Sequence, residues 1–242
     1  MTEDPGAFSR ATGRVATGDE EGGPDKPKYR RYQYDLIAPH CGRSVLEVGA
    51  GLGEFATQFS GRDRVVVTDV DPQAVKVAAE RFADRPEFET AVLDLGGDMP
   101  DIEPVESLIA INVLEHFDDD AGTLRNMASV VSPGGNLVIW VPGYQALYGD
   151  FDRRVGHFRR YNPAMLSGAM RRAGLTVKLA RPVNLLGGLA WWAAVRKGGT
   201  GSPKPGLVGI YDNYVVPVTR VLDKVLPVPF GQSVLGVAQL PK

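Results

Sequence analysis

Short apolar runs alternate with helical patterns along most of this chain, and that alternation restricts the fold more than any other feature. Strands of a parallel sheet read as near-continuous apolar runs, because helices between them cover both faces of the sheet. An α/β fold with a mostly parallel sheet is therefore expected. The expected strands are residues 44–49, 64–70, 88–95, 106–114 and 136–142.

The segments between these runs carry helical signals. Asp71 and Pro72 form a good helix start, since aspartate is favoured at the N-cap and proline at the first helical position. A helix is also expected to begin at the glycine-rich turn around Gly53. The expected helices are residues 29–40, 54–61, 72–84, 118–131 and 162–174.

The pattern changes after residue 174. Expected strands at 175–183 and 233–240 are separated by a long excursion, residues 184–232, with apolar residues at helical spacing and an interruption at Pro217. We expect the last strand to return antiparallel beside the strand before it. The excursion would then be a helical cap or insertion of a single domain covering residues 29–242.

Composition sets limits on the partners of the chain. With 242 residues, 43% of them hydrophobic, it is long enough for one well-covered α/β domain. The formal net charge of -2 argues against nucleic acid as the main partner. Residues 1–28, rich in glycine, proline and charge, predict a disordered arm without an export signal. Because the chain has one cysteine and no apolar run long enough to span a bilayer, we expect a cytoplasmic protein without a transmembrane segment.

A glycine turn follows the first expected strand, in the sequence VLEVGAGLGE from Val45 to Glu54. Glycine lets the backbone adopt φ > 0 and lets a ligand approach the main chain closely. A dinucleotide fingerprint would place its third glycine at position 54, where the Glu54 carboxylate would repel a pyrophosphate. Bare backbone near Glu47 instead suits the zwitterionic methionyl part of S-adenosylmethionine. Asp69 follows Gly51 by 18 residues, close to the spacing at which an acid binds ribose hydroxyls.

Longer segments resemble the class I S-adenosylmethionine-dependent methyltransferases, in particular the bacterial small-molecule enzymes. These segments are VLEVGAGLGEFA, VVVTDVDPQAV, AVLDL, NVLEHFDDDAGTLRNMASVVSPGGNLVIWVP and GHFRRYNPAMLSGAMRRAGL. The resemblance implies a Rossmann-like seven-stranded sheet, with six parallel strands and an antiparallel last strand, and S-adenosylmethionine as the cofactor. It implies a cofactor site made of Glu47, Gly49, Gly51 and Gly53 at the methionyl part, Asp69 at the ribose, Val70, Asp94 and Leu95 at the adenine, Asn112 under the sulfonium, and Tyr32 or Arg31 at the carboxylate.

Two histidines are candidates for the base that a hydroxyl acceptor needs, His116 in NVLEHF and His157 in FDRRVGHFRRY. Packing beside the cofactor, without contact to substrate, is the alternative for His116. Some related enzymes hold a divalent metal with an E-V-x-E-H segment, but here Asn112 replaces the first acid and leaves Glu115 and His116. The loss of a charged oxygen ligand disfavours Mg²⁺, so we expect no metal.

Arginine and histidine alternate with aromatic residues between Phe151 and Tyr161. Guanidinium groups suit carboxylates and phosphates. We therefore predict an anionic or aromatic acceptor near Arg154, Arg159 and Tyr161, with Tyr29 as a second aromatic wall. A solvated basic loop is the alternative for any single arginine.

Together these features predict methyl transfer to an oxygen, or less readily a nitrogen, of a small natural-product-like or sugar-like acceptor in biosynthesis. RNA methylation is an alternative that the arginine and aromatic segment favours and the acidic balance opposes. A non-catalytic cofactor-binding or interaction protein, with the apolar excursion as its working surface or as a homodimer contact, is another. An oxidoreductase is the third, and Glu54 argues against it.

Overall fold

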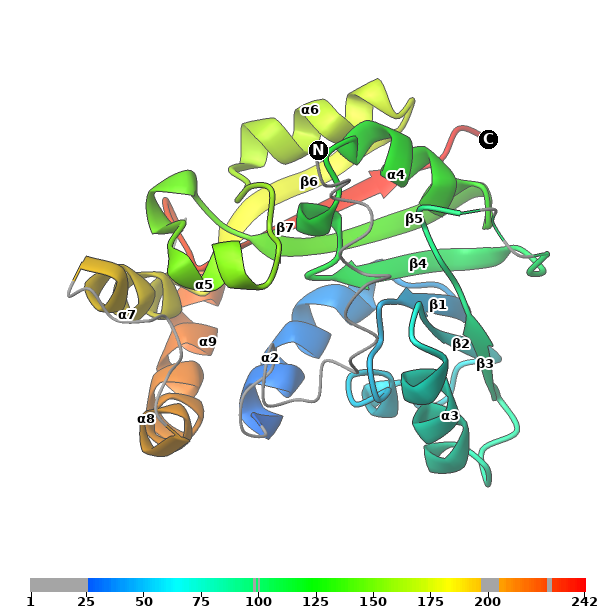
Figure 1. Ribbon diagram of the computed structural model, residues 1–242, viewed down its shortest axis with the longest axis horizontal. Coiled ribbons are helices and arrows are strands. Elements are labelled where there is room, and N and C mark those ends of the chain that lie inside the picture. The colour runs from blue at the N-terminus through cyan, green and yellow to red at the C-terminus, as the bar shows by residue number, and fades with distance from the viewer. Residues whose placement is uncertain (1–25, 98, 100, 197–204, 226–227) are drawn as a thin grey trace, which may run out of the picture.

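Seven strands form one sheet in the order β3-β2-β1-β4-β5-β7-β6, with helices packed on its faces (Figure 1). The computed structural model describes residues 26–97, 99, 101–196, 205–225 and 228–242. Strand β7 is antiparallel to both of its neighbours and the other strands run parallel, which confirms the expected composition of the sheet. The strands are β1 (Ser44–Val48), β2 (Arg64–Asp69), β3 (Phe88–Val92), β4 (Val105–Ile111), β5 (Val131–Pro142), β6 (Thr176–Val183) and β7 (Ser233–Gln239).

Most helices begin where the sequence signals place them. The Asp71 side chain accepts a hydrogen bond from the backbone N–H of Gln73 at 2.8 Å, so it caps its helix as expected. The first 25 residues of the expected arm lie outside the described residues, and α2 begins at Pro27. The α-helices are α2 (Pro27–Ile37), α3 (Pro72–Arg81), α4 (Asp120–Ala128), α5 (Asp150–Arg154), α6 (Pro163–Arg172), α7 (Leu185–Arg196), α8 (Pro205–Ile210) and α9 (Val216–Val225).

Both faces of the sheet are buried, as the continuous apolar strands predict. Along β1, Leu46 packs into the core under α4 and α6, whereas its neighbour Val45 packs into the core under α2, α3 and α9. In β4, Leu108 packs into the first of these cores and Ile109 into the second. Figure 1 shows α4 and α6 on one side of the sheet and α2 and α3 on the other. Because successive side chains of the strands fill one core or the other, a ligand can bind only at the ends of the strands.

The helix expected at residues 54–61 does not form. Its place is taken by tight turns and a short 3₁₀ helix, Ala56–Gln58. Phe55 has right-handed helical backbone angles, but Phe59 is extended with ψ of 109°, so the helical turn ends after Gln58. Phe55 and Phe59 then pack edge to face beneath Tyr34, which holds the segment against α2.

The last strand lies inside the sheet rather than at its edge. Strand β7 pairs with β5 on one side and β6 on the other, so β6 is the edge strand. The chain between β6 and β7 forms α7, α8, a π-helical turn (Tyr211–Val215) and α9. Of the described helices, none combines the length and the apolar character that crossing a bilayer requires.

The carboxyl ends of β1 to β4 meet at one edge of the sheet. Val48 at the end of β1 pairs with Thr68 of β2 and with Ala110 of β4. Asp69 at the end of β2 pairs with Val92 of β3. The residues that follow these strands are therefore neighbours, and they include most of the expected cofactor contacts.

Candidate functional site

The three glycines after β1 have different structural roles. Gly49, Gly51 and Gly53 all have positive φ. A Cβ atom on Gly49 would lie 2.6 Å from Val113 Cγ2, and one on Gly53 would lie 2.8 Å from Phe82 Cε2. A Cβ atom on Gly51 would meet no described atom within 4 Å. Packing therefore requires two of these glycines, whereas Gly51 presents bare backbone to open space where a ligand can lie.

Asp69 fixes the shape of this turn. Its Oδ2 atom accepts a hydrogen bond from the Gly51 N–H at 2.8 Å, and its Oδ1 atom accepts one from the Asp71 N–H at 2.9 Å. The side chain is only partly buried, and each carboxylate oxygen can accept a further hydrogen bond. The arrangement suits two ribose hydroxyls. Ribose binding by Asp69, the role expected from the sequence, stays a prediction.

Glu47 is the most unusual acid at this edge. It is 3% exposed, and its Oε2 atom has no hydrogen-bond partner in the described part of the chain. Burial, followed by the nearby Asp69 carboxylate, raises the pKa of Glu47 to about 8, while Arg30 opposes the shift. An unsatisfied buried carboxyl is costly, and a ligand ammonium group would satisfy it.

Arg30, rather than Tyr32 or Arg31, is the residue of α2 that lies at the glycine turn. Its Nη2 atom is 2.7 Å from Oε2 of Glu54. Arg31 instead pairs with Asp35 at 3.0 Å on the outside of α2. Arg30, Arg31 and Tyr32 are adjacent in sequence, so only the direction in which each side chain leaves α2 decides which of them lies at the glycine turn.

The contact expected from Tyr32 is not supported by its position. Its ring is 1% exposed, and its hydroxyl donates to Asp223 and accepts from the backbone N–H of Asn184. Tyr29, expected at the substrate, packs against the rings of Tyr32, Trp140 and Tyr211 in the second core. Burial raises the pKa of Tyr29 to about 12. Both tyrosines therefore join α2 to the sheet and to the segment before β7.

The other expected cofactor residues follow β2, β3 and β4. Val70 is exposed, and Asn112 is exposed with φ of 53° at the end of β4. Asp94 accepts a hydrogen bond from Gly96 N–H at 2.8 Å, which shapes the loop after β3. Leu95 is an exception, since its side chain is buried in the core and only its main chain remains for a ligand.

These residues fit S-adenosylmethionine. Gly51 offers bare backbone, Glu47 is a buried acid with an unsatisfied oxygen, and Asp69 ends the strand at which open α/β sheets bind ribose. A pyrophosphate would face three carboxylates here, those of Glu47, Glu54 and Asp69. The donor set therefore favours a ligand with an ammonium group and without phosphates.

A second group of ionisable side chains lies between α5 and the loop after β4. The His157 side chain is 8% exposed, and its Nδ1 atom is 2.8 Å from Oδ1 of the fully buried Asp152. Asp152 also accepts hydrogen bonds from Arg160 Nε at 2.8 Å and from the Gly149 N–H at 2.9 Å. Burial of Asp152 favours its neutral form, but the hydrogen bonds from His157 and Arg160 outweigh burial and lower its pKa.

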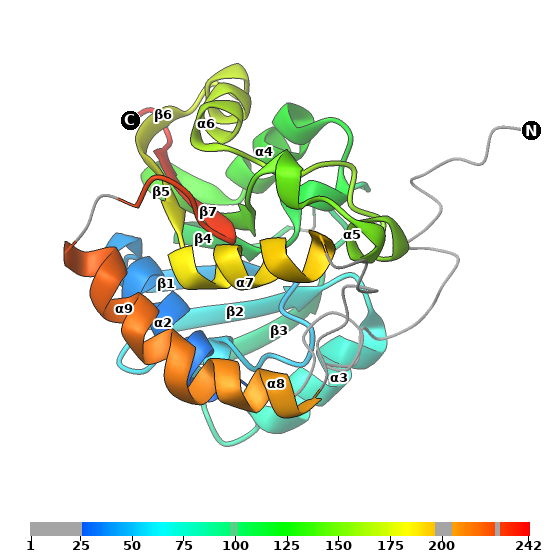
Figure 2. The same ribbon diagram turned by 90° about the vertical axis from the view of Figure 1, so that its left-hand side faces the viewer.

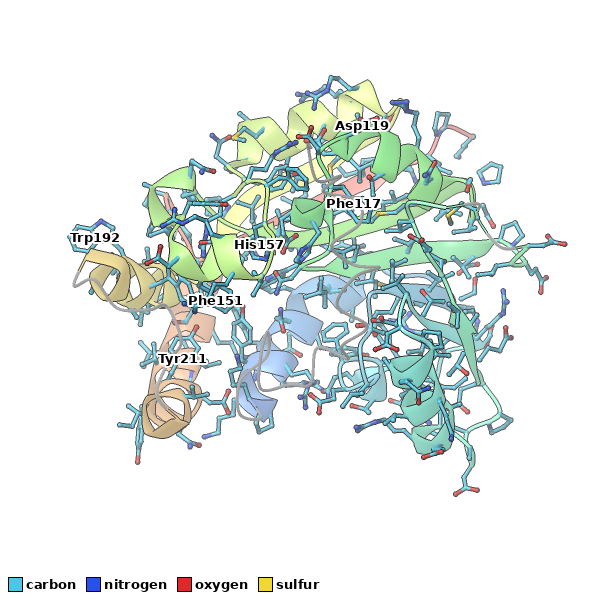
Figure 3. The ribbon with its side chains drawn as sticks, viewed as in Figure 1. Phe117, Asp119, Phe151, His157, Trp192 and Tyr211 are labelled. Atoms are coloured by element: carbon cyan, nitrogen blue, oxygen red, sulfur yellow. The ribbon has the colours of Figure 1, made fainter. Side chains whose placement is uncertain are left out.

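The two expected bases are neighbours in space. The rings of His116 and His157 meet edge to face with centroids 4.7 Å apart. Burial, followed by the proximity of His157, lowers the pKa of His116 to about 4. The Nε2 atom of His157 faces Oε1 of buried Glu115 at 3.9 Å. In Figure 3, His157 lies toward the middle of the molecule above Phe151.

The same group has the spacing of metal ligands. One ligand atom each from Glu115, His116 and His157 lies within 4.8 Å of the others. Asn112, where a related metal-binding segment has an acid, is exposed at the end of β4. The expectation that no metal binds here stays a prediction.

The expected anion-binding cluster does not form one surface. Arg159 pairs with Asp118 at 2.5 Å and Asp120 at 3.5 Å, and the Tyr161 ring is buried with its hydroxyl 3.5 Å from Asp120. Arg154 is exposed on α5. The segment mainly ties α5 and α6 to α4, which the sequence did not indicate because it does not reveal which acids face these cations.

Asp152 is the functional candidate that the sequence analysis missed. It lies in the polar run DFDRR, where a buried acid and a surface acid look alike. A signal was available, since Asp152 is the third residue after Gly149 and can accept from its N–H.

Residues 46–137 match the family model described as a methyltransferase domain. The chain is 36% identical over 112 residues to a fumosorinone synthetase of Cordyceps fumosorosea, a match that covers 42% of this chain and 3% of that protein. It is 33% identical over 118 residues to a tRNA U34 carboxymethyltransferase of Methylococcus capsulatus, covering 46% of this chain and 36% of that protein.

Among solved structures, the N-methyltransferase NodS of Bradyrhizobium japonicum, in complex with S-adenosylhomocysteine, superposes with a TM-score of 0.60 at 18% identity. That alignment covers 99% of this chain and 100% of NodS, and at this identity it shows the fold alone. The chain spans less than half the length of the curated relatives it matches. Residues 46–137 thus match a methyltransferase domain, and the chain as a whole has the fold of the S-adenosylmethionine-dependent methyltransferases.

Proposed function

We propose that the chain transfers the methyl group of S-adenosylmethionine to an oxygen atom of a small-molecule acceptor, with His157 as the general base. The observation that carries this proposal is the hydrogen bond between His157 Nδ1 and the buried carboxylate of Asp152. A carboxylate on Nδ1 selects the tautomer in which Nε2 accepts a proton, and it stabilises the imidazolium that forms.

The segment that carries His157 is joined to the loop after β4, which is expected to lie beside the methyl donor. The Phe158 N–H donates to the backbone oxygen of Glu115 at 2.8 Å, which fastens the histidine segment to the loop after β4. Asn112, the expected neighbour of the sulfonium, begins that loop three residues before Glu115. An acceptor that reaches His157 would therefore lie on the sulfonium side of the sheet edge.

The residues of the chain contribute positioning and proton transfer. S-adenosylmethionine, when bound, supplies a methyl carbon that is already activated by its sulfonium. Glu47 and Gly51 would hold the methionyl part of that molecule, and Asp69 would hold its ribose. His157 Nε2 would take the proton of the acceptor hydroxyl as that oxygen forms its bond to the methyl carbon.

Nitrogen is the less favoured acceptor atom. A neutral amine attacks without a base, so an N-methyltransferase would have little use for the Asp152–His157 pair. The relatives do not decide this point, because their names describe different chemistries, including carboxymethyl transfer to tRNA. RNA is also less favoured, since Arg159 and Arg160 are occupied by acids of the chain.

A metal-assisted form of the same transfer is the second candidate. The ligand spacing of Glu115, His116 and His157 supports it. The carboxylate of Asp152 at Nδ1 of His157 is also the hydrogen-bond partner that a metal-bound histidine usually has. Glu115, His116 and His157 would hold the metal, which would lower the pKa of the acceptor hydroxyl so that water could take its proton.

A labelled-methyl assay against metabolite extracts tests the proposal. The wild-type chain and His157→Asn are incubated with methyl-labelled S-adenosylmethionine, and labelled products are separated and identified. The proposal expects an O-methyl product whose formation is strongly reduced in the variant. An N-methyl product formed equally by both proteins would refute the oxygen acceptor and the role of His157.

A further inference from the structure

The helical segment before β7 has an apolar face that points to solvent. Its exposed residues recur at intervals of four, four, three and four, which places them along one side of α8, the π-helical turn and α9. Over 15 intervals this outer face extends about 22 Å at the rise of an α-helix. The face is made of Ile210, Tyr214, Val218, Val221 and Val225, with exposed fractions of 55%, 73%, 50%, 60% and 68%.

The orientation of these helices is fixed by polar residues on their inner side. Asp212 accepts hydrogen bonds from the backbone N–H groups of Lys28 at 3.2 Å and Tyr29 at 2.8 Å, at the start of α2. Asp223 accepts from Tyr32 and from the backbone N–H of Asn184. Both acids are buried. Rolling the helices to bury their apolar face would break these bonds and is therefore unfavourable.

A cationic groove lies beside the outer face. Lys28, Arg31 and Arg220 line a cavity of about 300 Å³, together with Pro27, Val216 and Pro217. Arg31 and Arg220 share the single carboxylate of Asp35, so positive charge is in excess. None of the exposed side chains described on α8, the π-helical turn and α9 is acidic.

Helix α7 extends this surface toward the histidine group. It packs against α9, and its Trp192 is 43% exposed and points away from the body of the molecule (Figure 3). The neighbouring Trp191 donates from Nε1 to the backbone oxygen of Leu147 at 3.1 Å and meets Phe151 edge to face. Figure 2 shows α7, α8 and α9 together on the side that faces the viewer.

We propose that the outer face of α8 and α9, with the cationic groove beside it, docks onto an anionic lipid bilayer. An apolar stripe bordered by cations, with exposed tyrosine and tryptophan, is the chemistry of a helix that lies in the bilayer interface. A second copy of the chain would bring the same excess of positive charge against itself across a two-fold axis, which disfavours a dimer through this face.

Vesicle flotation with the full chain tests the docking. Vesicles of phosphatidylcholine with phosphatidylglycerol are compared with vesicles of phosphatidylcholine alone, at low and high salt. Binding to the anionic vesicles is expected, with a loss of roughly tenfold at high salt because the cations are screened. Val218→Asp combined with Val221→Asp should reduce the bound fraction by a similar factor or more.

Val77→Asp is the matched control, because Val77 is a valine with 40% exposure on α3. It should bind vesicles as the wild type does, and thermal unfolding should confirm that all variants fold. Wild-type protein that stays unbound with both kinds of vesicle would overturn the proposal. It would also be overturned if light scattering showed that the wild type is a dimer and the double variant a monomer with unchanged vesicle binding.

Discussion

His157 and Asp152 are joined twice, once through their side chains and once through their backbones. The ring Nδ1 lies 2.8 Å from Oδ1 of Asp152, and the His157 N–H donates to the backbone oxygen of the same residue at 2.8 Å. Residues 152–157 therefore form one closed turn at the end of α5. The imidazole has little freedom to rotate, which is the condition that a positioned base requires.

His157→Asn should lower the rate of O-methyl transfer by about 10²- to 10⁴-fold, the usual contribution of a general base. The asparagine amide can still donate to Asp152, so the turn is retained while the proton acceptor is removed. Steady-state rates with the acceptor identified from extracts give the measurement. Calorimetry with S-adenosylhomocysteine should show unchanged affinity, and a variant with full activity would show that another group takes the proton.

Asp152→Asn should act through His157 rather than on substrate. The amide can no longer stabilise the imidazolium, so we expect about a 10- to 10³-fold lower rate and a changed pH profile, with little change in KM. Asp150→Asn is the control, since Asp150 is exposed on the same helix and pairs with Arg153. A loss of rate without any change in the pH profile would indicate a structural role only.

Asp69→Ala should weaken cofactor affinity by roughly ten- to a hundredfold, the loss of one or two charge-assisted hydrogen bonds. Asp71→Ala is the matched control, because Asp71 caps α3 and should cost about 1 kcal/mol of stability while affinity stays nearly constant. Calorimetric titration with S-adenosylmethionine measures both. Equal affinity in the Asp69 variant and the wild type would place the ribose elsewhere.

The sheet and its ligand-binding edge could be predicted from sequence because they depend on local signals. Apolar runs determine the strands, and the carboxyl ends of parallel strands meet at one edge. That reasoning is enough to place Gly51 near Asp69, and the two residues are indeed hydrogen-bonded. The helix expected after Gly53 is reduced to a short 3₁₀ turn because the backbone becomes extended at Phe59, whose ring is buried in the core.

The histidine group could be predicted only in part, because its assembly depends on tertiary contacts. The motifs indicated His116 and His157 separately, but the fold alone places their rings 4.7 Å apart and buries Asp152 at Nδ1 of His157. The spacing of Tyr214, Val218 and Val221 likewise predicts a helix face without saying whether it points inward. Asp212 and Asp223 decide that question through partners far away in sequence.

Removal of divalent metal should leave the activity unchanged. The expectation rests on Asn112, a neutral residue where a metal-binding segment would supply a second acid. Activity is compared before and after treatment with EDTA, and metal content is measured by elemental analysis of the purified protein. A loss of activity that Mg²⁺, Mn²⁺ or Zn²⁺ restores would instead support the metal-assisted candidate, with Glu115, His116 and His157 as ligands.

The contribution of Glu47 to the stability of the ligand-free protein should fall as pH rises from 4.5 to about 8. Burial, and then Asp69, raise the pKa of Glu47 from 4.5 to about 8, so in this window the folded chain holds a proton that the unfolded chain has lost. The contribution of Glu47 is complete below pH 4.5 and is lost through pH 8. Urea unfolding at pH 5 and pH 8 should show that the wild type loses, relative to Glu47→Gln, free energy of unfolding of the order of a few kcal/mol.

Binding of S-adenosylmethionine near pH 7 should release a proton from Glu47. The ligand ammonium favours the ionised carboxylate, so the raised pKa of Glu47, about 8 in the free protein, returns toward its ordinary value when the ligand binds. Titration calorimetry in two buffers of different ionisation enthalpy counts the protons. We expect up to about one proton per ligand for the wild type and none for Glu47→Gln, with weaker binding in the variant. A wild-type enthalpy that is the same in both buffers would show that the ammonium does not face Glu47, and the orientation of the methionyl part would have to be revised.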